Sequence, residues 1–198
     1  MEPANESFAS RILGRLAHAI YYWRRWFIYP QIVLAGAAYG ARDYQEAEAD
    51  AGRAIAANPK AVDAFVYKAM ARMAVAVKAD DQSKETWSAI RKIIGTANRL
   101  DPDDPEPLVL FYRSFAQAGL TPTKNAREGL YLAFQLGPQD KGLRMTAATS
   151  YLQDNNPKMA RELLKPLAFD PHNQGLAKVA ADLITEIDAG KGAEALRA

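Results

Sequence analysis

The sequence contains no cysteine, so disulfide bonds and thiolate metal sites are excluded. It has only two histidines, His18 and His172, and neither has a second histidine at the spacing of a metal site. A glycine-rich phosphate loop and a Gly-x-Ser-x-Gly motif are also missing. Since no acid, base, nucleophile or metal set converges, we expect a protein that is not an enzyme and needs no cofactor.

An excess of charge of one sign is missing as well. The chain has 25 basic and 23 acidic residues, a net charge of +2, which provides no global field to hold nucleic acid. Hydrophobic residues make up 49% and charged residues 24%, and this balance is typical of a folded protein. The partners expected from composition therefore do not include nucleic acid.

Long uncharged apolar runs are absent too. The best candidate, residues 17–38, is interrupted by Arg24 and Arg25, whereas a membrane-spanning helix needs about 20 nearly uncharged residues. Residues 1–7 carry two glutamates and no basic residue, unlike the start of a secretory signal. We expect a cytoplasmic location. If the chain is a fragment of a longer protein, a periplasmic or membrane-associated location stays open.

Helical patterns, by contrast, are found throughout, and strand patterns are almost missing. Helical stretches end repeatedly in a short polar stop with proline, at Asn58-Pro59, Asp101-Pro102, Gly137-Pro138 and Asp170-Pro171. These prolines lie 43, 36 and 33 residues apart. A period of about 34 residues is typical of a helix-turn-helix repeat. Proline suits these places because it cannot continue the preceding helix, yet its fixed φ suits the start of the next one.

The first of these units carries a family resemblance, in which small residues alternate with large ones on two helices. The matching residues are Leu34, Gly36, Ala37, Tyr39, Tyr44, Ala47, Ala51, Ala54, Asn58 and Pro59. This pattern resembles a full tetratricopeptide repeat (TPR), as found in bacterial TPR-like proteins. Small residues let two helices cross closely, and a tyrosine at the turn fills the remaining gap.

The later units resemble the repeat less well. The second has extra residues at 79–84, the third has Tyr112 where a small residue is usual, and the fourth has Pro157 where the turn tyrosine would be. The resemblance covers about residues 30–172. It implies an all-α, right-handed superhelical solenoid of about four helix pairs, preceded by an amphipathic helix and closed by a C-terminal capping helix. The expected ranges are 1–29, then repeats at 30–61, 62–103, 104–139 and 140–172, then the capping helix and tail at 173–198.

The N-terminal segment combines basic and aromatic residues on a helical pattern. Its candidate contact residues are Arg11, Arg15, Trp23, Arg24, Arg25, Trp26 and Phe27. Three interpretations remain open. The helix could cap the first repeat, because aromatic stripes at helical spacing usually face a core. It could also lie on an anionic membrane as a peripheral anchor, or dock on another protein.

The resemblance further implies a concave groove that holds an extended peptide or a partner helix. The candidate groove residues are Tyr39, Val66, Tyr67, Met70, Met73, Val109, Arg113, Gln117, Arg144 and Tyr151. Chaperone-binding members of the family clamp a terminal carboxylate with Lys and Asn as well as Arg, and such a Lys-Asn set is missing here. We instead expect an aromatic and Met-rich groove. Arg113 and Arg144 would hold an acidic residue of a short amphipathic ligand.

The function expected from these features is that of a protein–protein interaction scaffold or adaptor with a protein or peptide partner. Two alternatives stay open: an accessory C-terminal domain of a larger enzyme, and a peripheral membrane assembly scaffold that uses the N-terminal helix. Repeat proteins also associate through exposed helix faces, so a homodimer is a further expectation.

Overall fold

The computed structural model describes residues 31–191, and every regular element in that range is an α-helix. The all-α prediction is therefore confirmed. The predicted N-terminal helix, with Arg11, Arg15, Trp23, Arg24, Arg25, Trp26 and Phe27, lies outside the described residues.

The chain divides into two compact units, Met1–Leu100 and Asp101–Ala198. In the first unit, residues 31–40 form a helix that is followed by α2 (Tyr44–Ala57), α3 (Val62–Lys78) and α4 (Lys84–Leu100). Helix α3 packs against both α2 and α4. It therefore buries two sides of its surface rather than one.

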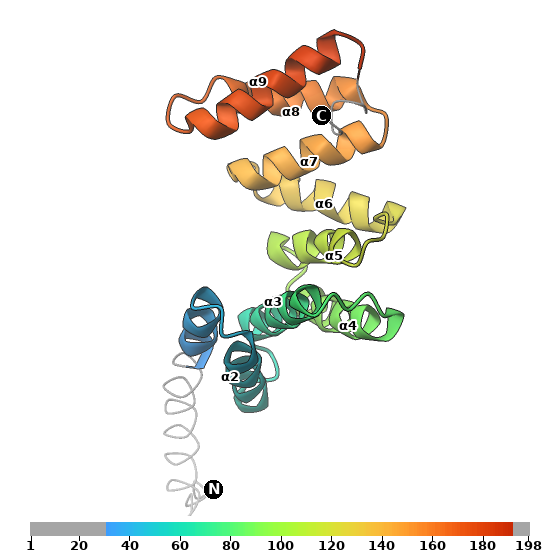
Figure 1. The fold of residues 1–198 in the computed structure, drawn as a ribbon. Coiled ribbons are helices and arrows are strands. Elements are labelled where there is room, and N and C mark those ends of the chain that lie inside the picture. The colour runs from blue at the N-terminus through green and yellow to red at the C-terminus, as the bar shows by residue number, and fades with distance from the viewer. Residues whose placement is uncertain (1–30, 192–198) are drawn as a thin grey trace, which may run out of the picture. The chain divides into compact units, whose positions relative to one another are not determined.

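The second unit is a stack in which each helix packs against the next along the chain (Figure 1). Its helices are α5 (Pro105–Gln117), α6 (Lys124–Leu136), α7 (Lys141–Gln153), α8 (Pro157–Ala168) and α9 (Gln174–Asp188). Each of the four repeat ranges predicted from the sequence contains two helices, and the predicted terminal range contains α9.

Side-chain caps fix where most of these helices begin. Asp43, Asp104, Thr123, Asp140, Asn156 and Asn173 each accept a hydrogen bond from a backbone N–H in the first turn of the helix that follows. A cap of this kind stabilises a helix by about 1 kcal/mol. Proline occupies the first helical position of α5 and α8, where its missing N–H costs nothing.

Small residues allow the helices of the first unit to approach closely. Ala35, Ala47, Ala51 and Ala54 are fully buried. At Gly36, an added Cβ would lie 3.0 Å from the Tyr67 hydroxyl oxygen, so the tyrosine ring lies directly on the helix formed by residues 31–40. Close crossing at small side chains is what the repeat pattern predicted.

Candidate functional site

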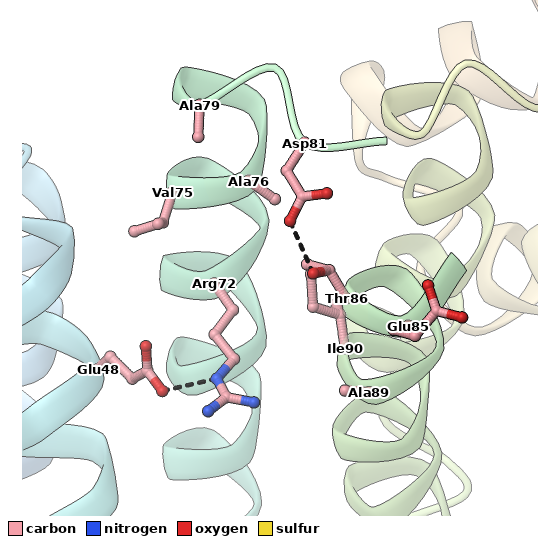
Figure 2. A pocket seen from close by; sticks show the side chains of 10 residues that line it. All are labelled: Glu48, Arg72, Val75, Ala76, Ala79, Asp81, Glu85, Thr86, Ala89 and Ile90. Carbon is pink, nitrogen blue, oxygen red and sulfur yellow. Dashed lines mark hydrogen bonds and ion pairs between the residues drawn. The ribbon is translucent and has the colours of Figure 1, made fainter. Parts of the chain in front are cut away.

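An open pocket lies in the first unit, where α3 ends and α4 begins (Figure 2). Its volume is about 490 Å³. Side chains from α2, α3, α4 and the α3–α4 turn line it: Glu48, Arg72, Val75, Ala76, Ala79, Asp81, Glu85, Thr86, Ala89 and Ile90. A pocket of this size is within the usual range for binding sites.

The floor of this pocket is apolar and built mostly from small side chains. Ile90 is 1% exposed and Ala76 is 3% exposed, so both belong to the core between α3 and α4. Ala79 and Ala89 add little volume above them, whereas Val75 is 36% exposed and offers apolar surface to a ligand. The hollow exists because alanine stands where larger residues would fill the space between the helices.

The rim of the pocket is charged. Arg72 Nε donates a hydrogen bond to Glu48 Oε1 at 2.6 Å, which joins α3 to α2 (Figure 2). Asp81 accepts from Thr86 Oγ1 at 2.7 Å, and Glu85 is exposed beside them. Three carboxylates and one guanidinium therefore line the pocket, and the guanidinium pairs with Glu48, so the pocket carries an excess of negative charge.

Asp81 holds the turn that forms one side of the pocket. The Ser83 side chain, the Thr86 hydroxyl and the Ser83 backbone N–H donate hydrogen bonds that hold the pKa of the Asp81 carboxyl below its ordinary value. The Asp81 backbone carbonyl accepts from Trp87 Nε1 at 2.6 Å. This turn falls within the extra residues 79–84 noted in the sequence. That departure from the repeat length was the signal that could have located the pocket.

A polar network joins α6 to α7 in the second unit. The Tyr131 hydroxyl donates to Asp154 Oδ2 at 2.9 Å and lies 3.1 Å from Ser150 Oγ, while Arg127 Nε pairs with Asp154 Oδ1 at 2.8 Å. Burial raises the pKa of Tyr131, so the hydroxyl keeps its proton and acts as a donor. All of these polar groups pair with one another, and the network is therefore a structural connection between the two helices.

Two further properties bear on the kind of site to expect. Among residues 31–191, no group of His, Asp and Glu side chains is arranged to hold a metal ion. Within the same range, no helix has the length and apolarity needed to cross a bilayer.

Two solved structures are similar to the chain over most of its length. The crystal structure of TTC0263, a thermophilic TPR protein in Thermus thermophilus, aligns with a TM-score of 0.67 and 18% identity, covering 88% of this chain and 93% of that one. The crystal structure of MamA protein aligns with a TM-score of 0.58 and 13% identity, covering 86% of this chain and 87% of that one. The chain has the tetratricopeptide repeat fold. No family model and no curated protein matches the sequence.

Three residues predicted to line a TPR groove are buried instead. Val66 is 4% exposed, Met73 is 3% exposed and Val109 is 9% exposed. The prediction of a ligand-facing position is wrong for these side chains. Val66 and Met73 pack inward because α3 has neighbours on two sides, and Val109 belongs to the core between α5 and α6 with Leu130.

The other predicted groove residues of the first unit are half-buried. Tyr39 packs against Tyr44 with ring centroids 5.3 Å apart, and Tyr67 lies on Gly36. Because successive residues of an α-helix turn by about 100°, Tyr67 and Met70 point to a different side of α3 from the pocket residues. Tyr67 and Met70 therefore do not belong to the surface of the first unit that forms the observed pocket.

In the second unit, Arg113 and Gln117 are exposed on α5. Arg144 is already engaged, because it donates to the Pro138 carbonyl at 2.7 Å and its guanidinium lies 5.0 Å from the centre of the Phe134 ring. Tyr151 is stacked on Tyr131, with ring centroids 4.0 Å apart. The two arginines predicted to act together therefore differ, since Arg113 is exposed whereas Arg144 is half-buried and already bonded.

Proposed function

We propose that this chain is a protein–protein interaction scaffold that binds a segment of a partner protein. The observation that carries the proposal is the open pocket of the first unit, which combines an apolar floor with a charged rim. Apolar surface supplies affinity, and a few charged groups fix orientation and partner choice. The TPR fold supports the proposal because a stack of helix pairs presents extended surfaces to a partner.

The floor and the rim suit a single side chain that has an apolar stem and a polar end. Val75 and the alanines at 79 and 89 would contact the stem, and the carboxylates of Asp81 and Glu85 would meet the end. A side chain of this kind buries its methylene groups while its charged group keeps hydrogen-bond partners.

The exposed and half-buried members of the predicted groove set remain a second candidate surface. In the first unit they are Tyr39, Tyr67 and Met70; Arg113 and Gln117 are a separate exposed pair on the second unit. Binding of an acidic ligand by Arg113 and Arg144 together remains a prediction. For this, Arg144 would first have to leave its contacts with Pro138 and Phe134.

Three matched baits in an affinity capture from the native host separate these surfaces. The native chain is compared with Ala79→Leu, which fills the pocket, and with a Tyr67→Ala, Met70→Ala, Arg113→Ala variant, which removes the groove set. A partner held by the native chain and the groove variant, but lost by Ala79→Leu, supports the pocket. If the partner is lost by the groove variant alone, the binding surface is the predicted groove set and not the pocket. Equal capture of the partner by all three baits would refute both surfaces.

A further inference from the structure

The pocket of the first unit favours a positively charged ligand. Besides its three carboxylates, it lies against the last turn of α3, which contributes Val75 and Ala76. Carbonyl groups at the C-terminal end of a helix add partial negative charge there. Among the described residues that line the pocket, the one cation is Arg72, which is occupied by Glu48. The exposed Lys78 and Lys84 stand next to the pocket in the sequence but do not line it.

The same chain carries a segment of opposite charge. From Ser7 to Arg42 there are five arginines and no acidic residue, so the excess of positive charge in this protein is concentrated near its start. Four of those arginines, at positions 11, 15, 24 and 25, are interspersed with apolar and aromatic residues. Residues 8–29 therefore offer the combination that the pocket accepts, which is a cation beside apolar surface.

We propose that the pocket binds an arginine side chain from residues 8–29 of a second copy of this chain. The inference rests on the proposed function and names the partner of its binding site. The guanidinium would meet Asp81 and Glu85, and its methylene stem would cover Val75 and Ala79. Arginine suits this place better than lysine because its planar group binds a carboxylate through two parallel hydrogen bonds.

Such a contact is heterologous, because a segment of one copy meets a pocket of another. It closes into a dimer when each copy inserts its segment into the other, and it extends into longer assemblies when the exchange is not reciprocal. In either case each copy contributes one segment and one pocket. When one copy has an altered segment and the other has an altered pocket, one contact remains possible. It joins the intact segment of the second copy to the intact pocket of the first.

Two variants of the 198-residue chain provide the test. The first, Glu85→Arg, reverses an exposed charge of the pocket, and the second replaces Arg11, Arg15, Arg24 and Arg25 by Gln. Sedimentation velocity at about 50 mM salt, where screening of charges is weak, should show the native chain associating and each variant alone as a monomer. An equimolar mixture should form a 1:1 complex, because the intact segment of the first variant enters the intact pocket of the second.

A matched control is Glu128→Arg, which makes the same charge change on an exposed position of α6 in the other unit. It should associate like the native chain, whereas Glu85→Arg should weaken association by about tenfold or more. A monomeric native chain, a Glu85→Arg variant that associates as strongly as the native chain, or a mixture that stays monomeric would overturn the inference. If capture of a different partner is lost by Ala79→Leu while the native chain is monomeric, this inference fails and the proposed function stands.

Discussion

Replacing Gly36 by Ala tests whether Tyr67 lies directly on the helix formed by residues 31–40. The new methyl group would lie 3.0 Å from the Tyr67 hydroxyl oxygen and 3.1 Å from its Cζ, closer than ordinary contacts. Overpacking of this kind costs about 1–3 kcal/mol. Alanine also stabilises a helix interior by about 1 kcal/mol relative to glycine. The two effects oppose each other, so Gly36→Ala alone should leave the free energy of unfolding unchanged or lower it by about 1–2 kcal/mol.

A double-mutant cycle separates the two effects. In a Tyr67→Ala background the clash is absent, so Gly36→Ala should stabilise the protein by about 1 kcal/mol. The coupling energy between positions 36 and 67 is then about 1–3 kcal/mol. Urea unfolding followed by tryptophan fluorescence suits the measurement, because all three tryptophans lie within residues 1–100. A coupling energy below about 0.3 kcal/mol, within the error of additivity, would refute the contact.

Three further substitutions test other connections. Trp87→Phe removes the hydrogen bond to the Asp81 carbonyl and leaves space in the core, so it should lower the free energy of unfolding by about 1–3 kcal/mol in urea titrations; no change would contradict the turn geometry. The Lys141 side chain and the His172 backbone N–H donate hydrogen bonds that lower the pKa of the Asp170 carboxyl. The ionised carboxyl therefore stabilises the folded state above the ordinary Asp pKa, and this contribution is lost as pH falls below about 4. Thermal melts between about pH 6 and pH 3 should therefore show a smaller loss on acidification for Asp170→Asn than for the native chain, and an equal loss would refute the pairing. Tyr131→Phe leaves the buried Ser150 hydroxyl without this partner and should cost about 1 kcal/mol in melting experiments, so an unchanged midpoint would count against the network.

The sequence was sufficient for the helices because their ends are encoded locally. Asp-Pro and Asn-Pro stops, capping side chains and alanines at helical spacing act within one or two turns of the chain. The extra residues at 79–84 were also visible. The pocket that these residues help to form was not visible in the sequence, since it depends on which side chains of α2, α3 and α4 leave the space between them unfilled.

The groove predictions were weaker because periodicity does not say how many neighbours a helix has. Helix α3 packs against two partners, so Val66 and Met73 face the core although they lie on the helix expected to line a groove. Arg144 shows the same limit for charge. Its partners, the Pro138 carbonyl and the Phe134 ring, become neighbours only when the α6–α7 turn closes.

The central claim is that the pocket at the end of α3 is the binding surface of this protein, and Ala79→Leu tests it most directly. Ala79 is an exposed residue at the C-cap of α3, so the larger side chain enters the pocket without entering the core. The affinity of native and variant chains for the captured partner should differ by about tenfold or more, while their free energies of unfolding agree within about 0.5 kcal/mol. Equal affinities at equal stability would contradict the account.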